Sequence, residues 1–462
     1  LDTGSEDWIF PGLIDLDPGL DHHLLPPFRP APGRSYGRRS DWLADGDYGR
    51  QVRELGAACE TWEDERGNRA LAVFSELRAI AGGTAVLRPP SPDPGAAAGE
   101  RRVVLGRDAS SAVEMGLDGA VPPTFDVFGP GAAGGAPTPR ADVLARYAEL
   151  RDRGIGGGTP LRAAFVRVAE GRPGFAHADG VDPRARREFE AFMALPAFAD
   201  VDGVRRSRLS ILGGGGIDTR DRRHLGFLRE RGLAVVWSPA SDLALYGDTL
   251  DVDSLLRAGV TVALGSAGST GSKHVWAEAK LARKWLRAID APVADEQIVR
   301  MATVDAASCL GAGSSDRSSA GSAGRPSSLG PGDLADLFIV RSPLSTDNPF
   351  EAFFAAADRD VRATIVGGRP IYGDLDLLER TGLEIQSLPR PEADHVDGKV
   401  VHLPPRLGVD VAAEMGRFEA FLLDREPPVE RSHLLTSGDE RDRRRRHRLH
   451  LRAVEAGAGL ID

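Results

Sequence analysis

Two buried apolar runs on either side of a helix constrain the fold more than any other feature of this sequence. Residues 233–237 form the first run, which ends at Ser238-Pro239, and residues 260–264 form the second, which ends at Gly265-Ser266. A strand, a helix and a strand in this order build a parallel sheet. Because ligands bind such sheets at the carboxyl ends of the strands, the small polar residues there mark the expected site.

Composition and charge narrow the class of protein. The chain has 462 residues, of which 41% are hydrophobic and 27% charged, as in ordinary folded proteins. Its net charge of −10 argues against nucleic acid as the main partner. Cys59 and Cys309, the two cysteines, predict no disulfide framework, and we expect a cytoplasmic protein without a membrane partner. The expected partner is a small-molecule ligand, and a homo-oligomer is allowed.

Three motifs in order carry a resemblance to a known family. They read WSPASDLALYG (237–247), GVTVALGS (259–266) and GSKHVWAEAKLA (271–282). This series resembles the amidohydrolase superfamily, in the branch of cytosine deaminase-like enzymes and triazine chlorohydrolases, where Ser-Pro-x-Ser-Asn precedes a Gly-Ser-Asp strand end. The resemblance implies an α/β fold, a (β/α)8 TIM barrel, over residues 10–332. It further implies a small β unit of residues 334–375 with 1–9, and residues 376–462 form a C-terminal extension with a basic tail.

The resemblance also implies five metal-ligand positions, and this chain departs from the family at them. The His-x-His motif falls on Asp17 and Gly19, and the strand ending His-x-x-Glu-Gly, aligned on Asp179-Gly180, places Ala176 in the histidine position. The remaining two positions are Gly213 and Ala267. A hydrolytic metal site needs about three protein ligands. We therefore expect no metal and no cofactor, and a larger pocket at the barrel mouth where small residues replace imidazoles.

Our first hypothesis is a metal-free relative that binds a small polar or heteroaromatic ligand, or that runs metal-independent acid/base chemistry. Asp17, Asp179 and His177 are the expected catalytic residues. The expected ligand-binding residues, taken from their positions in the resemblance and near the strand ends, are His22, His23, Arg39, Trp42, Ser241, Asp242, Tyr246, Ser266 and His274.

Two alternatives stay open. A metal site rebuilt from Asp17, His22 or His23, His177 and Asp179 would support metal-dependent hydrolysis or deamination at a non-peptide C–N bond. A non-catalytic scaffold, that is a pseudoenzyme, is the third possibility.

Local patterns predict several further elements. Helices are expected at residues 140–153 and 159–170, the second with Thr159 as N-cap and Pro160 in the first helical position. Strands are expected at residues 9–16, 84–87, 102–105, 124–128, 209–212 and 337–340, a β-hairpin at 361–372 and a helix at 409–423. The four glycines from Gly213 lack the spacing of a phosphate-binding loop.

Overall fold

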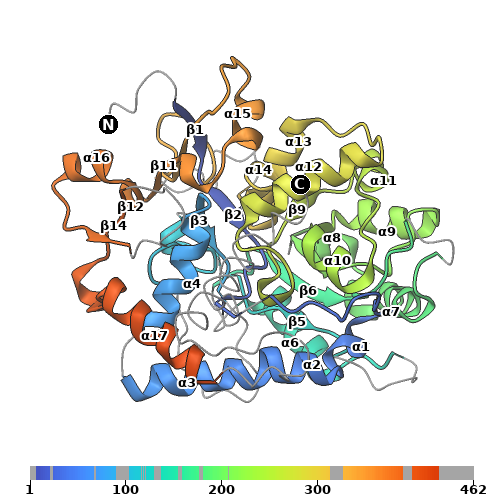
Figure 1. Cartoon of the computed structure of the whole chain (residues 1–462). Helices are drawn as coiled ribbons and strands as arrows, with labels where there is room; N and C mark the ends of the chain where they lie inside the picture. Colours follow the sequence, from blue (N-terminus) through green and yellow to red (C-terminus); the bar gives the residue numbers. More distant parts are fainter. Residues whose placement is uncertain are drawn as a thin grey trace.

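Parallel and antiparallel strands form separate sheets in the computed structural model (Figure 1). The structure describes residues 7–425 apart from residues 21–23, 26, 67–68, 90–102, 116, 118, 120, 130–136, 155–158, 176–179, 207, 313–325 and 389–397. Among the described residues, no helix is both long and apolar enough to cross a membrane.

The parallel strands form two sheets, each ordered as in the sequence. The first contains β2 (Leu13–Asp15), β3 (Thr84–Leu87) and β4 (Arg107–Asp108). The second contains β5 (Phe125–Asp126), β6 (Ala164–Val168), β7 (Leu209–Gly213), β8 (Ala234–Trp237) and β9 (Val262–Leu264). This arrangement confirms the predicted α/β class with parallel sheets.

Helices follow or precede most of these strands. They are α1 (Arg39–Leu43), α2 (Gly46–Tyr48), the π-helix η2 (Gly49–Glu54), α3 (Leu55–Arg66), α4 (Ala70–Ile80), α5 (Ala112–Met115), α6 (Ala141–Arg153), α7 (Pro183–Met193), α8 (Val201–Arg206), α9 (Arg222–Arg231), α10 (Pro239–Tyr246), α11 (Val252–Arg257), α12 (Val275–Ala288), α13 (Asp295–Met301), α14 (Val304–Cys309), α15 (Pro349–Ala355), α16 (Leu375–Leu378) and α17 (Val411–Arg425). Several begin at clear sequence signals. Before α7, the Asp182 carboxylate accepts hydrogen bonds from the Arg184 and Ala185 backbones, and Pro183 occupies the first helical position.

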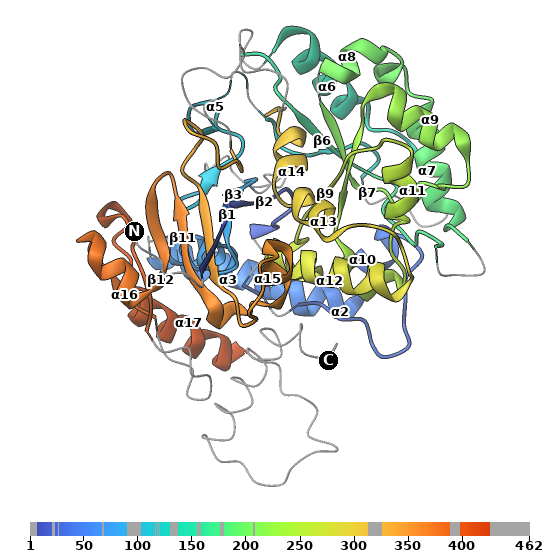
Figure 2. The same cartoon turned by 90° about the horizontal axis from the view of Figure 1, so that it is seen from above.

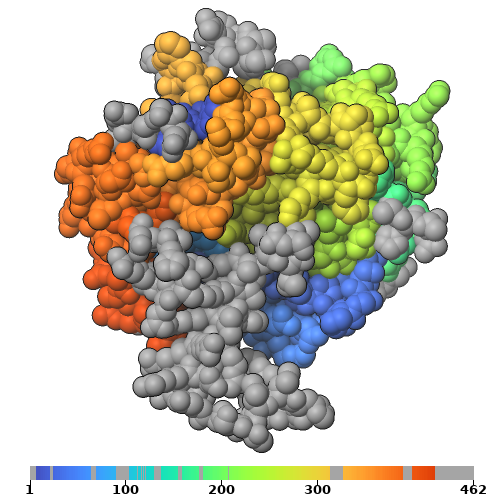
Figure 3. Space-filling model, turned by 45° about the horizontal axis from the view of Figure 1, so that its top comes forward, coloured from blue at the N-terminus to red at the C-terminus, as the bar shows by residue number. Residues whose placement is uncertain are grey.

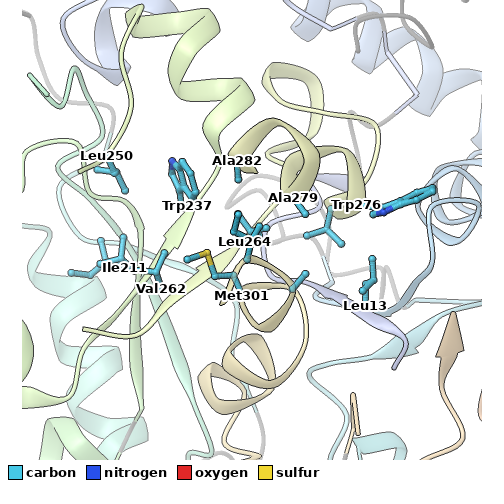
Figure 4. Close-up of a cluster of buried hydrophobic side chains, with 14 of the residues drawn as sticks. Leu13, Ile211, Trp237, Leu250, Val262, Leu264, Trp276, Ala279, Ala282 and Met301 are labelled. Atoms are coloured by element: carbon cyan, nitrogen blue, oxygen red, sulfur yellow. The ribbon is translucent and has the colours of Figure 1, made fainter. Parts of the chain in front are cut away.

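Most residues of the second parallel sheet are apolar and buried. Every residue of β8 and β9 is buried. Figure 4 shows Trp237, Val262 and Leu264 gathered with Met301 of α13 and Ile211 of β7 in one core. Burial of this kind explains why near-continuous apolar runs predicted these strands correctly.

The ends of β2 and β9, the outer strands of the two parallel sheets, are joined by hydrogen bonds. The Ala267 backbone N–H donates to the Asp17 carbonyl at 2.8 Å. The Ser266 N–H donates to Oδ1 of Asp15 at 3.0 Å. Burial raises the pKa of Asp15 to about 6. The carboxyl ends of the first and last parallel strands therefore lie side by side.

The antiparallel sheet runs in the order β1-β10-β11-β12-β14-β13. Its strands are β1 (Asp7–Pro11), β10 (Leu337–Arg341), β11 (Val361–Val366), β12 (Arg369–Asp374), β13 (Gln386–Ser387) and β14 (Lys399–Val401). It lies to one side of the parallel strands (Figure 2). In the space-filling view, the segment with β10 to β12 (orange) packs directly against the one with α12 and α13 (yellow) (Figure 3). There the Trp276 indole N–H donates to the Phe353 carbonyl at 3.0 Å.

Several predicted elements need correction. The helix predicted at residues 159–170 is wrong, because that stretch contains β6, whose buried run pairs with β5 and β7. The strand predicted at residues 102–105 is wrong for the described residues 103–105, and β4 lies slightly later. Residues 9–16 form two strands in different sheets. They divide at Gly12, where a Cβ would lie 2.5 Å from the Ala85 Cβ.

The buried Asp336 carboxylate joins the two kinds of sheet. It accepts two hydrogen bonds from the Arg107 guanidinium, both at 2.7 Å, and one from the Gly367 N–H.

We predict that Asp336→Ala lowers the free energy of unfolding by about 3–5 kcal/mol, because it leaves a largely buried guanidinium unpaired. Asp142→Ala, which breaks the exposed pair with Arg140, should leave the free energy of unfolding nearly unchanged. Equal losses in chemical denaturation would contradict this role for Asp336.

Candidate functional site

Charged side chains gather where the parallel strands end. Asp17 follows β2, Arg88 follows β3, and Asp126 ends β5. Arg167 lies in β6, and Glu170 comes two residues after that strand. Because the carboxyl ends of parallel strands share one edge, these residues meet at the edge where α/β folds place their sites.

Asp17 lies between two guanidinium groups. Its Oδ1 is 3.1 Å from Nη2 of Arg88, and its Oδ2 is 3.2 Å from Nη2 of Arg167. Arg88 is held from its other side as well, because its Nη1 donates to the Thr124 hydroxyl at 2.6 Å. Its guanidinium also stacks over the Phe165 ring at 4.8 Å. The carboxylate and both cations are therefore fixed in place.

Electrostatics keeps Arg167 charged. Burial alone would favour its neutral form, but Asp17 and then Glu170 outweigh that effect and raise its pKa above the usual range. Burial lowers the pKa of Arg88, and Asp17 opposes that shift. An arginine stays protonated in either case.

Glu170 accepts hydrogen bonds at both of its oxygens. Nη1 of Arg167 donates to Oε2 at 2.9 Å, and the Tyr246 hydroxyl donates to Oε1 at 3.1 Å. Nε1 of Trp42 donates to that hydroxyl at 2.9 Å. Burial raises the pKa of Tyr246 well above its usual value, so the phenol remains a donor. Arg39 completes the group, with Nε 3.7 Å from Oε2 of Glu170.

The two signs of charge balance within this cluster. Its cations are Arg39, Arg88 and Arg167, and its carboxylates are Asp17, Asp126 and Glu170. Nη1 of Arg39 pairs with Asp126 at 2.7 Å. We call these six residues, with Trp42 and Tyr246, the edge cluster. Chemically it offers fixed positive charge beside carboxylates that can exchange a proton.

β6 gives the His-x-x-Glu-Gly motif a second placement. Residues 174–175 are not in a strand and residues 176–179 lie outside the described part of the chain, whereas β6 ends two residues before Glu170-Gly171. On this strand, Arg167-x-x-Glu170-Gly171 has the spacing of the motif, with Arg167 in the histidine position and Glu170 as its glutamate.

The described residues do not fit a metal at this edge. The five ligand positions read Asp17, Gly19, Arg167, Gly213 and Ala267, and of these only Asp17 can donate to a cation. Both glycines have positive φ, of 53° and 92°. A Cβ on Gly19 would lie 2.8 Å from the Gly268 Cα, and a Cβ on Gly213 would lie 2.9 Å from the Glu170 Cβ. A histidine at either position would need the chain to move.

The space left at the edge cluster itself is small. The cavity bordered by Arg39, Asp126, Arg167 and Glu170 has a volume of about 10 Å³, roughly the room for one water. Glycines here allow the backbone to close in and do not leave empty space. A larger cavity of about 420 Å³ lies among the loops after β6 and β7, with Phe175, Arg186 and Ile217 in its wall.

Elsewhere in the described part of the chain, Glu190, Asp221 and His224 offer ligand atoms within 4.8 Å of one another. Nδ1 of His224 accepts a hydrogen bond from the Asp218 backbone, so the proton of the neutral ring sits on Nε2. That Nε2 lies 3.9 Å from both carboxylates. A protonated nitrogen cannot bind a metal, and Arg186 already pairs with both acids. This group carries no metal site.

Three of the predicted ligand-binding residues, Arg39, Trp42 and Tyr246, join Asp17 in the edge cluster. Ser241 and Asp242 instead have internal partners, since they hydrogen bond to the hydroxyls of Thr270 and Thr249 at 2.8 Å. Ser266 is fully buried. His22, His23, His177 and Asp179 lie outside the described residues, so their predicted roles stay predictions.

The contacts described for His274 are with residues outside the edge cluster. Its ring accepts a hydrogen bond from the Ala277 N–H and so caps α12. The ring packs on Gly82, where a Cβ would lie 2.2 Å from it, and Nε2 is 3.5 Å from Asp358. These are structural contacts between α12, the chain before β3 and the turn of residues 358–360 that precedes β11.

The sequence prediction missed Arg88, Asp126, Arg167 and Glu170. A signal existed for two of them, because Arg167-x-x-Glu170-Gly171 keeps the spacing of the family motif. Arg88 also directly follows a correctly predicted strand. Its partner Asp17 was predicted from β2, but nothing in the sequence showed that the two side chains meet.

Comparison with known proteins identifies deaminases as relatives over part of the chain. The chain is 36% identical over 168 residues to 5-methylthioadenosine/S-adenosylhomocysteine deaminase of Syntrophobacter fumaroxidans, covering 34% of this chain and 36% of that protein. It is 30% identical over 161 residues to the 5'-deoxyadenosine deaminase of Methanosarcina mazei, covering 33% and 34%. The matched part thus spans about a third of the length of these relatives. No family model matches.

Among solved structures, atrazine chlorohydrolase of Arthrobacter aurescens aligns with a TM-score of 0.48 and 19% identity, over 82% of this chain and 88% of that one. These curated relatives are deaminases by name, in agreement with the resemblance that the motifs carry. Because they are deaminases, they fit the alternative of a metal-dependent hydrolase or deaminase better than the metal-free hypothesis or a scaffold.

Burial of His274 predicts a pH-dependent stability. It lowers the pKa of the imidazole to about 4, whereas an unfolded histidine has a pKa of about 6.5. Between these values the unfolded chain binds a proton that the folded chain does not. The contribution of His274 to the free energy of unfolding is therefore fully present above about pH 6.5. It decreases as the pH falls and is about 2 kcal/mol lower at pH 5. Burial raises the pKa of Asp15 to about 6 and those of Glu76 and Glu278 to about 7, so these carboxyls act in the opposite direction over the same pH range. The contribution of His274 is therefore measured as the difference between wild type and a variant without the imidazole, in denaturant unfolding at pH 7 and pH 5.

His274→Asn is the matched variant, since asparagine also caps helices and does not titrate. Its free energy of unfolding should fall less between pH 7 and pH 5 than that of the wild type. An identical fall in both proteins would show that His274 does not cause the pH dependence.

Proposed function

We propose that this chain, a relative of the deaminases of the amidohydrolase superfamily, hydrolyses a non-peptide C–N bond at the carboxyl edge of its parallel strands. The observation that carries the proposal is the 36% identity over 168 residues to a deaminase. The position of Glu170 supports it, because a carboxylate directly after β6 keeps the acidic residue of the His-x-x-Glu-Gly motif.

We also propose that the two parallel sheets are arcs of one (β/α)8 barrel. Together they supply eight parallel strands in sequence order. The bonds from Ala267 to Asp17 and from Ser266 to Asp15 join the end of the eighth to the end of the first. We keep the predicted barrel of residues 10–332 as part of this proposal.

Glu170 is the group best placed to move a proton. One oxygen accepts from the Tyr246 hydroxyl and the other from Arg167, so the carboxylate is oriented at both ends. In C–N hydrolysis such a group accepts a proton from the attacking water and returns it to the leaving nitrogen. Since the described residues do not fit a metal, we assign no step to one.

We propose an amino-substituted heteroaromatic compound as the substrate class. The relatives' names specify methylthioadenosine, S-adenosylhomocysteine and 5'-deoxyadenosine, all with an exocyclic amine on a purine. The 420 Å³ cavity after β6 and β7 is within the size range of small-molecule sites, and Phe175 offers it an aromatic ring. We propose that the purine enters from this side.

A second candidate is ligand binding without turnover. The observation in its favour is the edge cluster itself, where three cations and three carboxylates pair and leave a cavity of about 10 Å³. Binding without ammonia release would support this candidate.

The experiment is an ammonia-release assay with the three adenosine derivatives on wild type, Glu170→Gln and Glu149→Gln. We expect Glu170→Gln to lower kcat about 10²–10⁴-fold, because the amide cannot accept a proton at neutral pH. Glu149, exposed on α6, is the matched control and should leave kcat unchanged.

Activity that survives Glu170→Gln within a factor of about three would contradict the assigned role. If the wild type releases no ammonia from any of these compounds or from other amino-heteroaromatics, the proposed hydrolysis is wrong. Isothermal titration with the same compounds then decides whether the protein binds them.

A further inference from the structure

We propose that the Arg88 and Arg167 guanidinium groups stand in place of a metal cation, so that Asp17 serves as their counter-ion and not as a metal ligand. The proposal concerns how the edge cluster is charged. It does not depend on the substrate or on catalytic turnover.

The first support is position. Asp17 and Arg167 occupy two of the five ligand positions, one after β2 and the other on β6. Two metal ligands would converge as donors on a shared cation. Here the two side chains instead face each other as opposite charges, at 3.2 Å. The positive charge is thus carried by one of the protein's own side chains.

The second support is the chemistry of arginine. A guanidinium has only donors, so it cannot bind a cation, and its charge repels one. Arg88 brings a second positive charge to Oδ1 of Asp17 at 3.1 Å, and its side chain is only 6% exposed. Both carboxylate oxygens of Asp17 are therefore already paired with cations. A divalent ion at Asp17 would have to displace both guanidiniums.

The third support is the backbone around the cluster. At Gly19 and Gly213 an added Cβ would meet Gly268 and Glu170 below 3.0 Å. The chain has thus closed over two positions from which imidazoles would have to reach a metal. The two neighbouring cations and the close approach of the backbone have the same effect, because each removes the space that the ligands of a metal ion would need.

The substitution has a chemical consequence. A metal lowers the pKa of a bound water, and guanidinium groups do not coordinate water in that way. They can hold negative charge that develops on an oxygen beside them, through preorganised N–H donors. We therefore assign Arg88 and Arg167 to positioning Asp17 and to supplying fixed positive charge at this edge.

The first test is metal binding by the full chain. Protein purified without chelator, from medium containing Zn, Fe and Mn, should hold less than about 0.1 metal ion per chain. Equimolar Zn²⁺ should change its melting temperature no more than it changes that of Asp17→Asn. About one ion per chain that disappears in Asp17→Asn, or a Zn²⁺-dependent rise lost in that variant, would overturn the proposal.

The second test is a double-mutant cycle of Asp17→Asn and Arg167→Gln, read as melting temperature in the absence of metal. Asp17→Asn should lower the melting temperature because it leaves two cations facing each other. The double variant should lose less than the sum of the single losses. Arg406→Gln, at an exposed position, is the matched control and should be neutral.

Additive losses in the cycle would show that Asp17 and Arg167 do not pair, and would overturn the proposal. If Asp17→Asn does not fold, the metal content of the wild type still decides, because stoichiometric metal contradicts a guanidinium substitute. Neither test measures ammonia release, so failure of the proposed hydrolysis leaves both results readable.

Discussion

The pairing of Asp17 with two guanidinium groups is the constraint on which the carboxyl edge depends. Its three members come from β2, β3 and β6, and so link the two parallel sheets through side chains. Arg167 also pairs with one oxygen of Glu170, and the Tyr246 hydroxyl donates to the other oxygen. The Trp42 indole N–H donates in turn to that hydroxyl. Removing the central carboxylate would leave uncompensated positive charge in a largely buried place.

Two glycines allow the backbone to approach closely around Asp17 and its guanidinium partners. Residues without a Cβ are often taken to leave room, but Gly19 and Gly213 have positive φ and lie against other parts of the chain. A left-handed backbone and close approach are what glycine permits best. The edge is thus filled by backbone and by paired charges, and the larger cavity lies farther out among the loops after β6 and β7.

The sequence predicted the α/β class, the strands at β7 to β9 and the β11–β12 hairpin, because long apolar runs and turn glycines are local signals. It misread β6 as a helix, because Thr159-Pro160 looks like a helix start, while the pairing that makes the strand comes from β5 and β7. The Glu-Gly motif was aligned on Asp179-Gly180, and the competing match at Glu170-Gly171 was hidden within the predicted helix. With β6 placed, Arg167 and Glu170 come to the edge. Long-range side-chain contacts such as that of Asp17 with Arg88 depend on the tertiary structure, so local sequence patterns do not predict them.

The curated relatives that match about a third of this chain are deaminases. The described side chains at the carboxyl edge are carboxylates paired with guanidinium groups. Anomalous diffraction at the zinc edge, from crystals grown with Zn²⁺, distinguishes guanidinium groups from a metal ion at Asp17. We expect guanidinium density at both oxygens of Asp17 and no anomalous peak beside them. A peak about 2 Å from Asp17, with Arg88 and Arg167 turned away, would contradict it.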